Sequence, residues 1–169
     1  SVVENDSTIY SAYTSVIKQF RAVGIHNIPH NIPIKLINLI ELNSKCSQSH
    51  VDLKGFTHTA PKYKTHPNYT IFILFGLPQI EFEAVLAHEL LHVWLDQNKI
   101  ILSPKIIEGF CNLGRYLIYY NNQSYFSKIH LKAMDNSKSS TYGIEYRKMK
   151  DKLEKIGWKI LISDLRNNY

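Results

Sequence analysis

The chain has 169 residues, a formal net charge of +6, and a composition that is 44% hydrophobic and 12% aromatic. These values are typical of a folded globular protein, and we expect a single domain spanning residues 1–169. Lysine and arginine are scattered rather than clustered, so the charge does not indicate a nucleic-acid-binding protein. No apolar run approaches the roughly twenty residues needed to span a membrane. The two cysteines, Cys46 and Cys111, are too few for a disulfide framework.

The first half of the chain predicts one helix followed by three strands. Apolar residues at helical spacing predict a helix over Thr8–Val23, with Asp6 or Ser7 as its cap and Gly24 as its end. Strands are then predicted by three segments rich in apolar residues. They are Ile34–Leu42, Val51–Thr57 and Tyr69–Phe75.

The strand that precedes the central motif has a possible functional role. We expect Ile71–Phe75 to lie at the edge of the sheet, where an extended substrate can pair with free backbone groups. An ordinary sheet strand without this role is an equally good interpretation of the same residues.

The second half predicts mainly helices. A helix ends near Asn98-Lys99, and a second begins where Ser103 can cap it and Pro104 fits its first position. Beyond Tyr120, two polar segments predict a loop-like rim, with a short apolar stretch of uncertain type between them. A final helix is predicted over Thr141–Ile156, ended by Gly157, and Trp158–Ile162 then forms a short strand or caps the core. The whole pattern predicts an α+β fold, a small mixed sheet with packed helices.

The segment His88-Glu89-Leu90-Leu91-His92 has the pattern of a zinc hydrolase. Side chains four residues apart share one face of a helix, so His88 and His92 can direct their ring nitrogens at one ion. Glu89 is the next residue after His88 on the predicted helix, and it can act as a general base that takes a proton from an attacking water. The alternative is a buried helix with two satisfied core histidines, which the apolar neighbours of the motif would suit.

A catalytic zinc site needs a third protein ligand, and Glu108 is the best candidate. It lies about one turn into the second helix, which can fold back beside the first. Alternatively, Glu108 only complements the positive end of the helix dipole. Its apolar flanks, however, indicate a helix that packs inward, where an unpaired acid is costly and a bound metal removes that cost.

Three neighbouring residues have predicted supporting roles. Asn112, four residues after Glu108, is expected to contact a histidine ligand. Asp96 could do the same from the motif helix, but a surface position is equally compatible with the sequence. Cys111 is expected to be a packed core thiol rather than a nucleophile or a ligand.

Several separated blocks resemble a known family in both order and spacing. They are Leu74–Pro78, His88–Leu95, Leu102–Pro104, Glu108–Cys111 and Tyr142–Arg147. Together they resemble the C-terminal peptidase domain of the DA-one-like family, the ubiquitin-activated, LIM-associated peptidases of plants, over roughly Leu53 to Leu165. The resemblance implies a zincin-like fold of the gluzincin type, one zinc ion held by His88, His92 and Glu108, and Glu89 as the catalytic acid/base.

The chain also departs from that family's architecture. With two cysteines it contains no LIM module, which needs many Cys and His ligands. It has no acidic amphipathic helix of the kind that binds ubiquitin. Ubiquitin dependence is therefore not expected to carry over.

The sequence predicts a zinc-dependent endopeptidase, a metalloprotease that hydrolyses protein or peptide substrates. Tyr142 is the first candidate for the donor to the oxyanion, because it lies in a Tyr-Gly block near a predicted helix start, and Tyr146 and His130 are the alternatives. One rival function is an inactive, peptidase-derived protein-interaction module, and another is a zinc amidase acting on non-protein substrates. We expect a cytoplasmic monomer.

Overall fold

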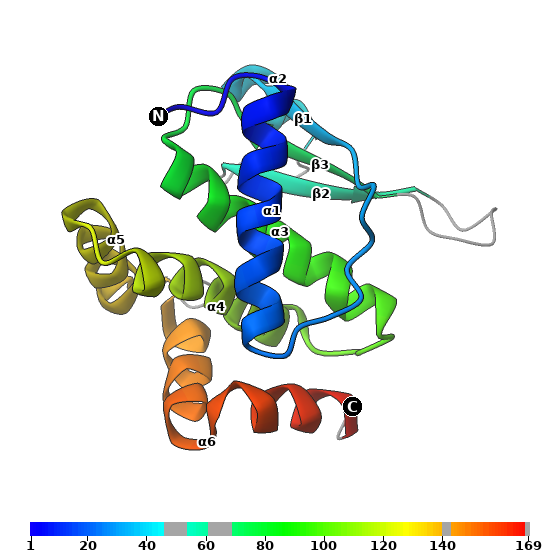
Figure 1. Cartoon of the computed structure of the whole chain (residues 1–169). Coiled ribbons are helices and arrows are strands. Elements are labelled where there is room, and N and C mark those ends of the chain that lie inside the picture. Colours follow the sequence, from blue (N-terminus) through cyan, green and yellow to red (C-terminus); the bar gives the residue numbers. More distant parts are fainter. Residues whose placement is uncertain (46–53, 61–68, 140–142, 168–169) are drawn as a thin grey trace.

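A computed structural model describes residues 1–45, 54–60, 69–139 and 143–167 of the chain (Figure 1). It is a mixed α+β structure in which helices dominate, as the sequence predicts. In chain order the elements are α1 (Asp6–Ala22), β1 (Ile34–Ile37), α2 (Leu39–Lys45), β2 (Gly55–Thr59), β3 (Tyr69–Leu74), α3 (Gln79–Gln97), α4 (Pro104–Asn122), α5 (Tyr125–Asn136) and α6 (Glu145–Asn167).

The sheet is mixed, as predicted, but its strand order corrects one expectation. The order is β1-β3-β2, with β1 parallel and β2 antiparallel to β3. The prediction that Ile71–Phe75 forms the sheet edge is therefore wrong, because β3 is paired on both sides. Its alternate residues Tyr69, Ile71 and Ile73 are buried, which suits a central strand. The edge beside α3 belongs instead to β2.

The first predicted strand is half as long as expected. Only Ile34–Ile37 is extended, and the remainder of Ile34–Leu42 belongs to α2. The cause is a local cap: the Asn38 side chain accepts a hydrogen bond from the Glu41 backbone N–H at 2.9 Å, and the Glu41 carboxylate accepts one from the Asn38 N–H at 3.3 Å. Such a capping box starts a helix whatever the β propensity of the flanking residues.

The other strand and helix limits differ by smaller amounts. β2 runs over Gly55–Thr59, and the predicted start at Val51 lies outside the described residues. For α1 the cap is Asn5, whose side chain accepts from the Thr8 N–H at 3.0 Å, rather than Asp6 or Ser7.

The stretch of uncertain type after Tyr120 is helix α5, and the predicted final helix continues further than expected. Gly157 interrupts α6 with a φ of 76°, as its predicted role as a helix end requires. Beyond it Trp158–Ile162 is helical, so the predicted strand there is wrong. The predicted start at Thr141 lies outside the described residues.

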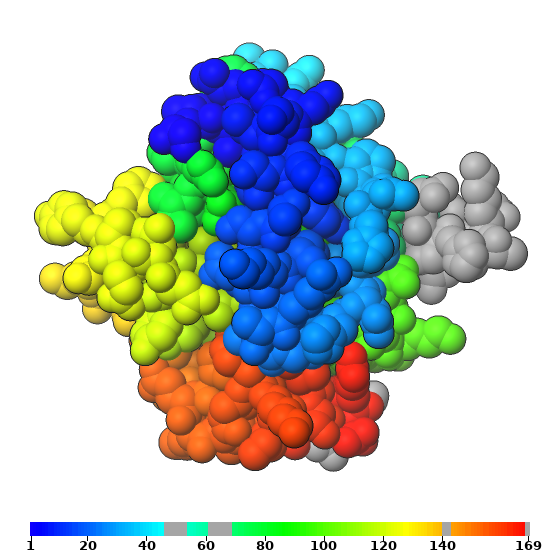
Figure 2. Space-filling view, in the orientation of Figure 1, coloured from blue at the N-terminus to red at the C-terminus, as the bar shows by residue number. Residues whose placement is uncertain are grey.

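Helix α3 lies at the centre of the structure. It packs against β2 and β3, against α1 and, most extensively, against α4. Almost every residue from Glu81 to Leu95 is buried. In Figure 2, α1 lies on the surface with α5 to one side and α6 below it, so the outer helices cover the central pair. Among the described residues, no helix is both long and apolar enough to cross a membrane.

A glycine sets the distance between α3 and α4. A Cβ built on Gly114 would lie 2.9 Å from the backbone carbonyl of Ala87, closer than side-chain carbons approach a backbone. Because Ala87 immediately precedes His88, this contact fixes α4 beside the motif. Gly109 does the same between α4 and α6, since its Cβ would lie 2.8 Å from the Glu145 backbone.

Replacing Gly114 with alanine should push α4 away from α3. We expect a loss of about 1–3 kcal/mol in the free energy of unfolding, the usual effect of overpacking a core. Urea denaturation followed by circular dichroism measures it, with Lys105→Ala on the exposed face of the same helix as the control. An unchanged midpoint for Gly114→Ala would show that the helices are not held at this distance.

Candidate metal centre and its cleft

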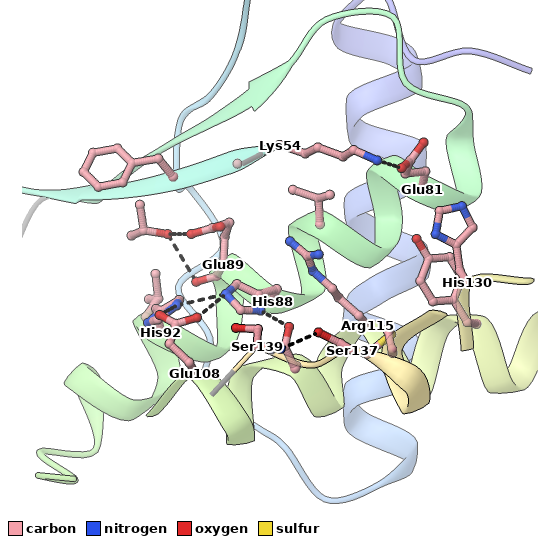
Figure 3. A pocket seen from close by; sticks show the side chains of 18 of the residues that line it. Lys54, Glu81, His88, Glu89, His92, Glu108, Arg115, His130, Ser137 and Ser139 are labelled. Atoms are coloured by element: carbon pink, nitrogen blue, oxygen red, sulfur yellow. Dashed lines mark hydrogen bonds and ion pairs between the residues drawn. The ribbon is translucent and has the colours of Figure 1, made fainter. Parts of the chain in front are cut away.

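Two helices bring three potential metal ligands together. His88 and His92 come from successive turns of α3, and Glu108 comes from the first turns of α4 (Figure 3). The ligand atoms of these three residues all lie within 4.8 Å of one another. The Nε2 atoms of the two histidines are 3.2 Å apart, and the Glu108 oxygens lie 3.3 Å from His88 Nε2 and 3.4 Å from His92 Nε2.

These spacings match the requirements of a tetrahedral divalent cation. A metal with bonds of about 2.0–2.1 Å to its ligands holds neighbouring ligand atoms about 3.3–3.4 Å apart. Two imidazole nitrogens and one carboxylate oxygen are also the donor set that zinc accepts in hydrolases. The three residues therefore provide suitable donors at suitable spacing, with one Glu108 oxygen facing each histidine.

The histidines are prepared to act as ligands. His88 Nδ1 lies 3.1 Å from Asn112 Oδ1, and since an amide oxygen can only accept, His88 donates from Nδ1 and leaves a lone pair on Nε2. Burial, and then the nearby His88, lower the pKa of His92, which favours the neutral form that can bind a metal. The predicted contact between Asn112 and a histidine ligand is confirmed.

Glu108 is ionised in this setting. Burial raises the pKa of its carboxyl, but the interactions with His88, and then with His92 and Arg115, outweigh burial and lower that pKa to about 2. A carboxylate is thus paired with two imidazoles in a half-buried position. Glu108 therefore faces both histidines, as the predicted ligand role requires, and that role stays a prediction.

Glu89 lies beside the ligand cluster and is held by the sheet. The Thr57 hydroxyl on β2 donates to Glu89 Oε2 at 2.7 Å. A Cβ built on Gly55 would lie 2.5 Å from Val85 and 3.1 Å from Glu89 Oε1, so only glycine lets β2 approach α3 this closely. The carboxylate that could serve as a base is therefore buried, oriented and adjacent to His88.

The cluster opens into a cleft of about 830 Å³ between β2, α3, α4 and α5. Figure 3 shows the candidate ligands at one end, the pair formed by Lys54 and Glu81 together with His130 toward the other end, and Arg115 between them. His130 stacks on Tyr119, with ring centroids 5.0 Å apart. The volume is in the range of small-molecule and peptide binding sites.

The remaining predicted residues are distributed differently. Tyr142 lies outside the described residues. Tyr146 is completely buried and does not line the cleft, so it cannot be an alternative to Tyr142, whereas His130 does line it. Asp96 is exposed and accepts a hydrogen bond from Tyr69, not from a histidine ligand. Cys111 is a fully buried free thiol, as predicted, and burial raises its pKa.

Two residues of the cleft were not anticipated from the sequence. Thr57 is distant in sequence from Glu89, and no local pattern links them. Arg115 had a usable signal, because it follows Glu108 by seven residues and therefore lies near the same face of α4.

Comparison with known proteins identifies the family of the chain. The model of the DA1-like family, described as Protein DA1, matches residues 34–155, which include all three candidate ligands. Protein DA1-related 2 of Arabidopsis thaliana is 44% identical over 48 residues, 28% of this chain and 9% of that protein. Protein DA1-related 1 of the same plant is 29% identical over 79 residues, 46% of this chain and 14% of that protein.

The aligned segments thus span no more than about a seventh of these curated relatives. No solved structure matches the chain significantly. The family match nevertheless covers most of the sequence, from the first strand through the metal centre into the last helix. This chain belongs to the DA1-like family.

Proposed function

We propose that this protein is a zinc-dependent peptidase that hydrolyses internal peptide bonds of protein or peptide substrates. The observation that carries the proposal is the convergence of His88, His92 and Glu108, whose ligand atoms lie within 4.8 Å of one another, with Glu89 beside them at one end of an open cleft. A zinc ion bound by the three ligands would supply Lewis acidity, which lowers the pKa of water and polarises a carbonyl.

The chain's own residues then have distinct tasks. Glu89 takes the proton of the attacking water and delivers it to the departing amine. Thr57 holds the Glu89 carboxylate by a 2.7 Å hydrogen bond and restricts its rotamers. Asn112 fixes the ring of His88, which keeps the ligand nitrogen directed at the ion.

The substrate is proposed to bind along β2. This strand lines the cleft through Gly55, Phe56, Thr57 and Thr59, and within the described part of the chain it pairs only with β3. Its second edge can therefore accept an extended peptide as an added strand. The role that the sequence suggested for the strand before the metal helix is thus transferred to β2.

The donor to the oxyanion is a separate proposal. Tyr142 remains the prediction from the sequence. Among the described residues, His130 also lines the cleft, but it lies at the end away from the candidate ligands, so it is the weaker alternative for this role.

The rival functions are less well supported by the geometry. An inactive interaction module has no need of a buried Glu89 held by Thr57, since an unused carboxylate at such a position carries a desolvation cost. A zinc amidase acting on non-protein substrates would use the same metal centre. Assaying peptides beside small amides distinguishes the two activities.

The Glu89→Gln protein should retain about one zinc ion per chain and lose peptide hydrolysis by several orders of magnitude, because glutamine cannot accept the proton. Zinc is measured by elemental analysis, and hydrolysis with a quenched fluorescent peptide library. Glu83→Gln is the control, since Glu83 lies on the same helix but bonds Ser15 and Gln79 outside the cleft. Equal turnover by wild type and Glu89→Gln would reject the proposal.

Removing the support of His88 should weaken the metal site. We expect Asn112→Ala to reduce zinc affinity by about 10–100-fold, the usual effect of losing a residue that orients a ligand. Competition with a fluorescent chelator gives the dissociation constant. Asn121→Ala, an exposed position on the same helix, should leave the constant as in the wild type.

A further inference from the structure

Arg115 is a positive group in the cleft that the proposed mechanism does not use. It extends from α4 between the metal centre and His130, reaching into the open part of the cleft (Figure 3). The residue is half-buried, and its Nε is fully buried without a hydrogen-bond partner. Such a group is costly unless something pairs with it.

The described acids nearby are engaged elsewhere. Glu81 forms an ion pair with Lys54, Glu89 accepts from Thr57, and Asp96 accepts from Tyr69. The Glu108 oxygens face His88 and His92. In the described part of the chain, Arg115 therefore forms no ion pair.

The distribution of charge in the cleft around Arg115 favours the binding of an anion. Lys54 and Arg115 are the lysine and arginine side chains among the described lining residues, and Lys54 is paired with Glu81. A divalent cation held by His88, His92 and Glu108 would offset the charge of Glu108. The cleft would then hold a positive site with no internal counterion.

We propose that Arg115 binds a carboxylate of the peptide substrate and so selects substrates with a negative charge close to the scissile bond. A guanidinium presents a planar fork of N–H donors that matches a carboxylate in bidentate geometry. The carboxylate can belong to an acidic side chain or to a free C-terminus. This inference rests on the proposed peptidase function and identifies its substrate class.

The position of Arg115 limits where the charge can lie. Seven residues of helix separate Arg115 from Glu108, a rise of about 10 Å. An extended peptide advances roughly 3.3–3.6 Å per residue. The carboxylate is therefore expected within about three residues of the bond that is cut.

A supporting role for Arg115 makes a different prediction. If the guanidinium only stabilises the ionised form of Glu108, its loss should weaken zinc binding and reduce cleavage of all peptides alike. If it binds substrate, its loss should change the preference between charged and neutral peptides at full zinc occupancy.

The test uses matched peptide pairs with the zinc-loaded protein. One set carries Glu or Gln at each of the three positions on either side of the cleaved bond, and a second set ends in a free carboxylate or an amide. We expect wild type to favour one acidic member by at least about ten-fold in kcat/KM, the effect of one charge-assisted contact. The set that responds identifies the source of the carboxylate.

Arg115→Gln should abolish the preference for the acidic peptide. Arg115→Lys should keep part of it, because lysine has the positive charge but not the planar fork of N–H donors. Arg21→Gln removes the same charge at an exposed position outside this cleft and should keep the wild-type ratio. Zinc content and thermal melting are measured for each variant. Three results would overturn the inference. They are equal cleavage of every peptide pair by wild type, an undiminished ratio in Arg115→Gln, and loss of zinc from that variant.

Binding separates failure of this inference from failure of the proposed function. The same peptides are titrated by calorimetry into zinc-loaded Glu89→Gln and into Glu89→Gln with Arg115→Gln. If wild type cleaves nothing, but acidic peptides bind tighter than neutral ones only when Arg115 is present, the peptidase proposal fails and the carboxylate site stands. Equal binding of both peptide classes by both proteins would reject the site itself.

Discussion

The close contact between α3 and α4 is the constraint on which the rest of the structure depends. Gly114 lies against the Ala87 backbone, where any side chain would meet a carbonyl at 2.9 Å. This contact places the start of α4 opposite the two histidines of α3, so Glu108 reaches both imidazoles within 3.4 Å. A wider separation of the two helices would leave a buried histidine pair without its carboxylate.

The polar cluster is stable in an apolar setting because each member has a partner. His88 and Glu89 are almost fully buried on a helix that is otherwise hydrophobic. Asn112 satisfies the first, and Thr57 satisfies the second. The support comes from α4 and from β2, so the candidate metal site depends on both packing surfaces of α3. Arg115 is the exception, and its unsatisfied Nε is the reason to assign it a ligand from outside the chain.

The predictions of secondary structure and strand order failed where a local or long-range contact outweighed the intrinsic preference of the residues for strand or helix. The capping box of Asn38 and Glu41 turned half of a predicted strand into α2. Ile71–Leu74 was correctly predicted to be extended, but its place in the sheet was not, because strand order depends on which segments pair. Apolar side chains at alternate positions, here Tyr69, Ile71 and Ile73, suit a central strand and a half-covered edge strand almost equally well.

The sequence by itself determined the chemical groups of the candidate site. The pattern of His88, Glu89 and His92 is a property of one helix. The spacing to Glu108 and Asn112 follows from a second helix, whose start is encoded by Ser103 and Pro104. Tertiary structure alone decided that Thr57 orients Glu89, that β2 rather than β3 is the edge strand beside the cleft, and that Arg115 faces the cleft without an ion pair among the described residues. The physical reason is the separation along the chain of the residues that must come into contact. Helical periodicity places residues a few positions apart on one face, whereas contacts between a strand and two helices depend on the packing of the whole core.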